Sequence, residues 1–177
     1  MNLFRKPVTW VVAVLAAVVL SIGLYLFQPW RLFTTVEVNE ALPAVPAPAA
    51  PAPVASAPAR TGAPAIEELA GGRFRSHEHT TEGAAKILRL PNGDRVLRIE
   101  NLSTSDGPDL RVWLSDQPVT DDWYSVGKGR TLELGHLKGN KGDANYAIPA
   151  GADLDVLKSV TIWCKRFGVS FGAAALA

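Results

Sequence analysis

The chain of 177 residues has a single cysteine, Cys164, and almost no net charge, since its formal charge is +1. One cysteine excludes a disulfide within the chain, so the folded part is held together by packing alone. The balanced charge excludes the basic field that nucleic-acid binding requires, and no nucleic-acid partner is expected. The sequence also lacks a Ser-His-Asp order, a zinc motif, a dinucleotide fingerprint and a phosphate-binding loop. An enzymatic function therefore has no positive support.

A long apolar run is present near the N-terminus. Residues 8–27 contain no charged side chain, and about 20 such residues in a helix cross a hydrocarbon core of about 30 Å. A cleaved signal peptide would have a shorter apolar region of about 7–15 residues and a small-residue cleavage site, neither of which fits this segment. We therefore expect an uncleaved, single-pass anchor in the lipid bilayer.

The orientation of this anchor follows from the charges at its two ends. Arg5 and Lys6 precede the apolar run, whereas only Arg31 follows it closely. Positive residues accumulate on the cytoplasmic side of membrane segments. We expect a protein of the plasma (cytoplasmic) membrane with its N-terminus in the cytoplasm and its C-terminal part extracytoplasmic.

Residues 41–65 consist mainly of alanine and proline. Each proline fixes φ and removes a backbone donor, so neither a helix nor a sheet can run through the segment. The composition predicts a Pro/Ala-rich linker, either an extended spacer or a disordered tether, that holds the following domain off the bilayer. The remaining residues, 66–177, have the size of one domain.

This C-terminal domain is predicted to be all-β. Residues 109–115 alternate with period two, and 95–101 behave likewise. The Asn92-Gly93 turn should pair 84–90 with 95–101 as an antiparallel hairpin, because Asn-Gly accepts positive φ. A single helical turn is conceivable at 66–70. With the strands below, the pattern predicts a small antiparallel β-sandwich or barrel-like domain. The further strand candidates are 73–77, 131–134, 144–148, 159–165 and 168–173.

Five short motifs occur in order along this domain. They are Gly-Arg-Phe at 72–74, Gly-Pro-Asp-Leu-Arg-Val-Trp-Leu-Ser at 107–115, Leu-Gly-His-Leu-Lys-Gly-Asn-Lys-Gly at 134–142, Asn-Tyr-Ala-Ile-Pro at 145–149, and Ser-Val-Thr-Ile-Trp-Cys-Lys-Arg-Phe at 159–167. Together they resemble the DM13 family, named as an electron-transfer domain. The resemblance implies a β-sandwich-like module on exported proteins, with a redox role through the cysteine that matches Cys164. His79 also matches the family pattern.

Cys164 is the first candidate site residue, and two interpretations of it are open. Alternation places it on one face with Val160 and Ile162, where a free cysteine is a buried core residue. Against this, Lys165 and Arg166 follow at once, and nearby cations lower a thiol pKa. A functional Cys164 would be a redox-active thiol or a ligand of a prosthetic group such as haem. Covalent c-type haem is excluded, since there is no C-x-x-C-H.

Two further features are weaker candidates. His77 and His79 would share one face of a strand and could bind a metal with Glu82 or His136 as a third ligand, but the favoured interpretation is a surface strand end without a metal. His79 alone could neighbour a haem or the thiol. The glycine-rich residues 139–146 are predicted to form tight turns, with a ligand cleft as the alternative.

The leading hypothesis is thus a membrane-tethered extracytoplasmic module with a redox or electron-transfer role centred on Cys164, acting with an envelope redox partner. The alternative is a non-enzymatic cell-envelope β-module that binds a ligand or a protein, for which the candidate surfaces are Trp123 with Tyr124, or the loop at 139–146. A purely structural domain is a third possibility.

Overall fold

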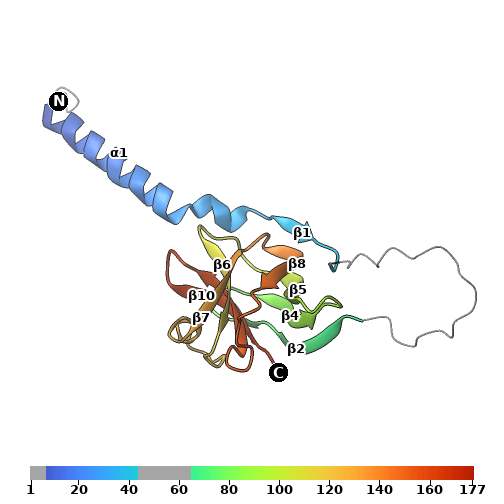
Figure 1. The fold of residues 1–177 in the computed structure, drawn as a ribbon. Coiled ribbons are helices and arrows are strands. Elements are labelled where there is room, and N and C mark those ends of the chain that lie inside the picture. The colour runs from blue at the N-terminus through green and yellow to red at the C-terminus, as the bar shows by residue number, and fades with distance from the viewer. Residues whose placement is uncertain (1–6, 44–64) are drawn as a thin grey trace, which may run out of the picture.

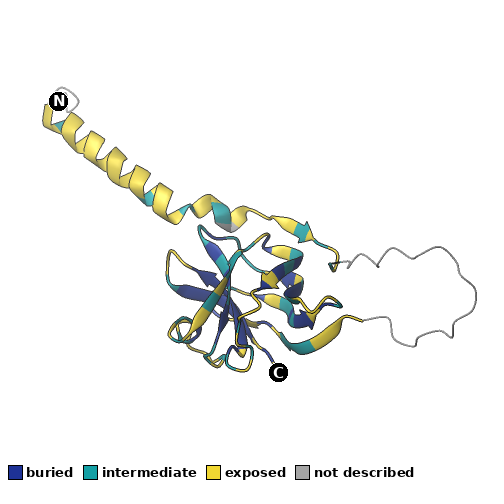
Figure 2. Cartoon of the chain, viewed as in Figure 1, coloured by how far each residue is buried: buried dark blue, intermediate teal, exposed yellow. Residues whose placement is uncertain are grey.

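The computed structural model describes residues 7–43 and 65–177. Helix α1 (Pro7–Phe27) is followed by the short 3-10 helix η2 (Pro29–Phe33). Helix α1 is long and apolar enough to cross a membrane, and none of its residues is buried and most are exposed (Figure 2). The apolar run at 8–27 is therefore confirmed as a helix of membrane-spanning length. Arg5 and Lys6, on which its predicted orientation rests, lie outside the described residues.

Two five-stranded sheets form the rest of the fold (Figure 1). One sheet has the strand order β1-β8-β5-β4-β2 and the other β3-β10-β9-β6-β7. All neighbours are antiparallel except β1 and β8. The prediction of an all-β sandwich preceded in the chain by one helix is confirmed. The strands are β1 (Glu37–Asn39), β2 (Glu67–Arg73), β3 (Arg75–Ser76), β4 (Glu82–Arg89), β5 (Arg95–Ser103), β6 (Leu110–Ser115), β7 (Thr131–His136), β8 (Lys141–Ile148), β9 (Ser159–Cys164) and β10 (Val169–Ala175), with the 3-10 turn η3 at Ser125–Gly127.

The core lies between the two sheets and follows the alternation of the sequence. Strand β6 buries Val112 and Leu114 completely in the main cluster. Its Trp113 points the other way and stacks on Trp163 of β9, with 5.1 Å between ring centroids. Since successive side chains of a strand point to opposite faces, this split confirms the period-two interpretation.

The hairpin of β4 and β5 is also confirmed, with Gly93 at a φ of 89° in its turn. Two other expectations were wrong. Residues 66–70 form no helical turn, because strand β2 pairs with β4 there. The single strand expected at 73–77 is broken at Phe74, a core side chain at which the chain crosses from one sheet to the other. Tertiary pairing overrides local preference at both places.

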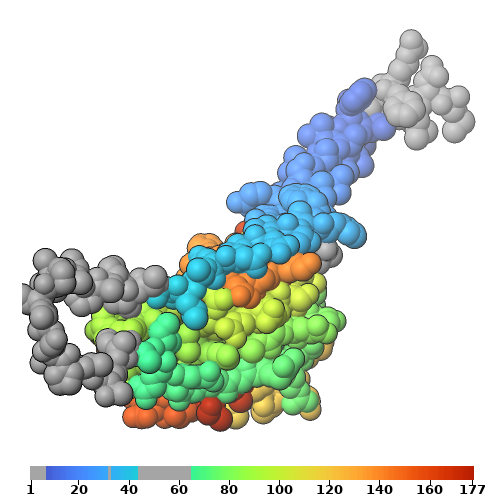
Figure 3. All heavy atoms as spheres, turned by 90° about the vertical axis from the view of Figure 1, so that its right-hand side faces the viewer, coloured from blue at the N-terminus to red at the C-terminus, as the bar shows by residue number. Residues whose placement is uncertain are grey.

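Strand β1 precedes the Ala/Pro-rich segment, and the sequence had not placed it in the domain. It forms one edge of its sheet and β2 forms the opposite edge. The predicted linker lies mostly outside the described residues, at 44–64, but its two flanks belong to one sheet. Both interpretations of this segment, an extended spacer and a disordered tether, therefore stay predictions. In Figure 3 the chain after α1 runs directly along the surface of the sheets.

The glycine-rich segment at 139–146 packs directly against strand β1. A Cβ atom on Gly139 would lie 2.5 Å from the carbonyl oxygen of Val36. A Cβ atom on Gly142 would likewise overlap the carbonyl oxygen of Val38. Between them, Asn140 accepts a hydrogen bond of 2.7 Å from the amide of Val36. The glycines therefore let β1 approach closely. The tight turn expected within 139–146 is instead the start of β8.

Candidate functional site

A pocket of about 520 Å³ lies where α1 meets the domain. The end of the helix forms one wall, and loops at one end of the sandwich form the others. Its lining combines aromatic and other apolar side chains with a few charged ones, which is the usual character of a small-molecule site. Six aromatic rings define this pocket, and we call it the helix-end pocket: Phe27, His79, Trp123, Tyr124, Phe167 and Phe171.

The turn between β9 and β10 holds the helix end against the domain. Phe167 in this turn stacks on Phe27, with ring centroids 5.5 Å apart and planes inclined by 26°. Its neighbour Arg166 donates hydrogen bonds to the carbonyl oxygens of Tyr25 at 3.1 Å and Leu26 at 2.9 Å. Both carbonyl groups belong to the last turn of α1, where no backbone N–H of the helix is left to bond them. A cation at this end of the helix also complements the helix dipole. The turn therefore caps the helix and closes one side of the pocket.

His79 lies in the wall of this pocket. Its ring centroid is 3.9 Å from that of Phe171, with the planes inclined by 47°. Its Nε2 atom is 2.5 Å from a carboxylate oxygen of Glu78. The structure thus places one of the two predicted site residues where a bound molecule would touch it.

Cys164 does not reach the pocket itself. Its side chain is 0% exposed and belongs to the main core cluster. It is directly opposite Val169 in the β9–β10 pair, so the two side chains are neighbours on the same face. Val169 also lines the pocket. The sulfur therefore lies one side chain behind the pocket wall, and the structure does not bring it into contact with His79.

The surroundings of Cys164 favour a protonated thiol. Burial raises its pKa, and the backbone N–H groups of Phe167 and Arg166 oppose this rise only in part. The two cations that follow in sequence bind elsewhere. Lys165 donates to Glu133 at 3.2 Å, and Arg166 caps the helix. The activation of the thiol that their proximity in sequence suggested is therefore absent from this geometry.

A haem held by these residues does not fit the structure. A ligand sulfur must reach the iron, but Cys164 is walled in by the core. The Nε2 atom of His79 is already engaged by Glu78. Cys164 therefore presents no donor atom to the helix-end pocket, and we derive no chemistry through a haem.

His77 is buried, at 8% exposure, and is not the surface residue that the sequence suggested. Its Nδ1 atom lies 2.8 Å from the Ser170 hydroxyl, and its Nε2 atom 3.0 Å from the carbonyl oxygen of Thr120. Both ring nitrogens are occupied, so His77 and His79 do not form a pair of metal ligands. Within residues 7–43 and 65–177, no three His, Cys, Asp or Glu side chains are grouped to bind a metal.

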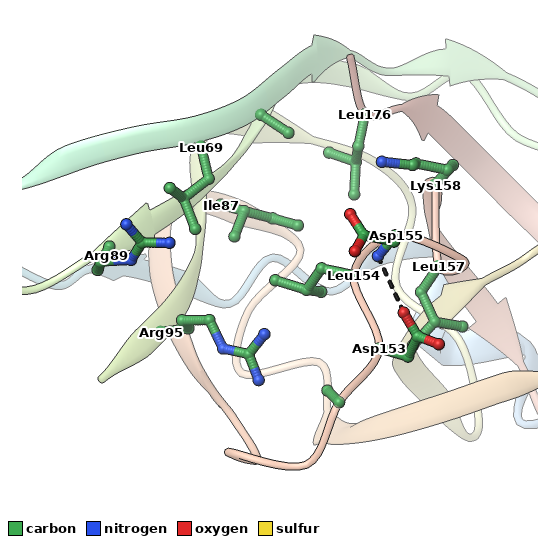
Figure 4. A pocket seen from close by; sticks show the side chains of 12 residues that line it. Leu69, Ile87, Arg89, Arg95, Asp153, Leu154, Asp155, Leu157, Lys158 and Leu176 are labelled. Carbon is green, nitrogen blue, oxygen red and sulfur yellow. Dashed lines mark hydrogen bonds between the residues drawn. The ribbon is translucent and has the colours of Figure 1, made fainter. Parts of the chain in front are cut away.

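A second cavity, of about 380 Å³, lies at the other end of the sandwich (Figure 4). Apolar side chains such as Leu154 form its floor. Its arginines are already engaged, because Arg89 pairs with Glu67 and Arg95 donates to two backbone carbonyl oxygens. Asp153 is likewise used locally and accepts a bond from the amide of Asp155. None of the predicted site residues lines this cavity.

An ion pair at the rim of the helix-end pocket was missed by the sequence reasoning. Arg31 approaches the Asp106 carboxylate at 3.3 Å and donates to the carbonyl oxygen of Gly107 at 2.8 Å. The partners are 75 residues apart in the chain. No local pattern in the sequence connects Arg31 with Asp106.

Comparison with known proteins gives the family of this chain. The family model described as electron transfer DM13 matches residues 73–176, which is more than half of the chain. No curated protein and no solved structure matches. The match begins in the last residue of β2 and ends after β10, so it includes His79, Cys164 and most of the pocket-forming loops. On this evidence the chain belongs to the DM13 family, the electron transfer DM13 domains.

Proposed function

We propose that this protein is an electron-transfer module attached by α1 to the cytoplasmic membrane, with its β-sandwich on the extracytoplasmic side. Three observations support the proposal. The DM13 match covers the sandwich, α1 has the length and apolar character of a membrane span, and the two cations before the helix favour a cytoplasmic N-terminus. The bilayer is then the first partner of the chain.

The observation that carries the redox role is the position of Cys164 behind the helix-end pocket. Val169, the partner of Cys164 in the β9–β10 pair, lines a space that a reactant can enter. Electrons cross one layer of packed side chains, whereas a thiol reagent does not. Burial also protects a lone thiol from uncontrolled oxidation in an oxidising compartment. In this proposal the thiol gives two electrons to an acceptor in the pocket, two protons leave to water, and one water molecule supplies the oxygen of the sulfenic acid that forms, which reduction returns to the thiol.

The test is a redox titration of the full chain in lipid nanodiscs. Samples are equilibrated with mediators at a series of potentials, denatured quickly, and their thiols are counted by alkylation and mass spectrometry. The chain has one cysteine, so we expect the count to fall from one to zero as the potential rises and to recover on reduction. Ile162→Val, on the same strand and core face, is the matched control and should show the same midpoint. A count that stays at one throughout the titration contradicts the redox role.

A specific observation favours a second candidate, the non-enzymatic binding module. Trp123 and Tyr124 remain 42% and 51% exposed on the rim of the pocket, and exposed aromatic residues are typical binding anchors. If binding alone is the function, Cys164→Ala leaves the biological phenotype intact and Trp123→Ala abolishes it. If electron transfer is the function, Cys164→Ala abolishes the phenotype.

A further inference from the structure

The helix-end pocket opens at the level where the chain leaves the membrane helix. Phe27, Gln28 and Pro29, at the end of α1 and the start of η2, form part of its wall. If α1 spans a bilayer, these residues lie at the membrane surface. A molecule dissolved in the bilayer can then enter the pocket without crossing water.

The pocket is suited to a flat ring. His79 and Phe171 present one pair of rings, and Phe27 and Phe167 present a second pair with nearly parallel planes. Trp123 is on the exposed rim. Aromatic faces bind a planar, polarisable ring better than a saturated one, since stacking adds to the burial of apolar surface. The volume of about 520 Å³ accommodates one ring system with its substituents.

The charged groups around the pocket already have partners. His79 is paired with Glu78, and Arg31 with Asp106. An anionic or cationic ligand would have to compete with an existing partner, so a neutral molecule fits best. The bonds from Arg31 to Asp106 and Gly107 all start at Nη1. Its guanidinium has five N–H groups in all, so it can still donate to a carbonyl oxygen.

We infer that the helix-end pocket binds the head group of a quinone carried in the bilayer. A quinone is neutral and planar, it offers carbonyl oxygens to a donor such as Arg31, and its apolar tail can stay in the lipid beside α1. The inference rests on the proposed function, because it names the membrane-borne redox molecule that would meet the sulfur behind Val169.

The test is calorimetric titration of the full chain in nanodiscs with a tail-less dimethoxy-methyl-benzoquinone, with empty nanodiscs as the blank. We expect saturable binding that Trp123→Ala and Tyr124→Ala each weaken about tenfold or more. The matched control is Phe33→Ala, an aromatic side chain near the helix end that is 89% exposed and does not line the pocket. It should bind within about twofold of the parent chain. The saturated cyclohexanedione analogue should bind at least about tenfold more weakly than the quinone.

Three results would overturn the inference: no saturable binding, equal weakening by Phe33→Ala, or equal binding of the saturated analogue. Because both rim side chains are partly exposed, their removal should leave the melting temperature nearly unchanged, and a circular dichroism melt verifies that each variant is folded. The redox titration separates the two proposals. A reversible thiol count without quinone binding rejects the quinone site alone, whereas quinone binding with a thiol count fixed at one supports the site and rejects the redox role.

Discussion

At the scale of single residues, the clearest feature outside the pocket is a row of buried, hydrogen-bonded polar side chains along the sheet that contains β9 and β10. His77 contacts Ser170, and Ser170 contacts Thr161 at 2.8 Å. A carbonyl oxygen only accepts hydrogen bonds, so the Nε2 atom of His77 must donate to Thr120. Burial lowers the pKa of His77, and the imidazole is therefore neutral in the folded protein.

This burial makes stability depend on pH. In the unfolded chain His77 takes up a proton as the pH falls below about 6.5, whereas in the folded chain it resists protonation. The unfolded state then binds more protons, so the free energy of unfolding decreases as the pH falls through this range, by at most about 1.4 kcal/mol per pH unit. Urea denaturation of a fragment covering residues 34–177, at pH 7.5 and pH 5, measures the effect.

His77→Gln is expected to flatten this dependence, because no ionisation is then suppressed at the site. The control is His136→Gln, whose parent side chain is 72% exposed and whose removal should keep the slope. An unchanged slope in His77→Gln would show that another group is responsible.

At the scale of elements, strand β1 has more anchoring than its three residues would suggest. So short a parallel pair is unstable by itself, but polar contacts just beyond it hold the chain. Arg98 is buried at 6% exposure and donates to the carbonyl oxygen of Glu40 at 2.6 Å. The Glu40 carboxylate accepts bonds from Lys138 at 2.8 Å and from the amide of Asn145 at 2.7 Å. Hydrogen bonds to Glu40, directly after β1, thus hold this edge strand on the sheet.

Gly139→Ala tests this element. The added Cβ would meet the backbone of Val36 and the side chain of Val38, so we expect β1 to be displaced at a cost of about 1–3 kcal/mol. Hydrogen exchange at the Val36 and Val38 amides should accelerate. Gly151→Ala is the matched control, because nothing lies within 4 Å of its Cβ. Unchanged exchange in Gly139→Ala would mean that the close approach does not hold the strand.

At the scale of the whole molecule, the helix and the sandwich form a connected unit. The Arg166 cap, the stack of Phe27 on Phe167 and the Arg31–Asp106 pair all join the end of α1 to the domain. Strand β1 then continues into the sheet. The domain therefore sits directly at the end of its helix, as Figures 1 and 3 show. This arrangement lets the end of α1 form one wall of the helix-end pocket.

A truncation tests the same arrangement. A fragment starting at residue 65 contains the whole DM13 match but lacks β1, which leaves the edge of β8 unpaired. Unpaired edges promote association with another chain. We expect this fragment to melt roughly 5 °C or more below the fragment 34–177 and to dimerise at high concentration. Circular dichroism melts and light scattering measure both properties. If the two fragments melt at the same temperature and both stay monomeric, β1 is dispensable.

Local patterns in the sequence determined the long apolar helix, the β class, the β4–β5 hairpin and the family. An uncharged apolar run, period-two alternation and an Asn-Gly turn each act through near neighbours, so one sequence suffices to recognise them. The same alternation placed Cys164 on the core face of β9, together with Val160 and Ile162.

Only the tertiary structure decided the rest. A three-residue edge strand shows no period, so β1 could not be read from its own residues. The direction of Arg166 away from the thiol and the burial of His77 depend on which distant segments meet. The helix-end pocket depends on the same long-range packing, since Phe27 and Phe171 lie far apart in the chain. Alternation states which side of a strand is apolar, whereas a site requires knowing what packs against that side, and long-range pairing alone sets this.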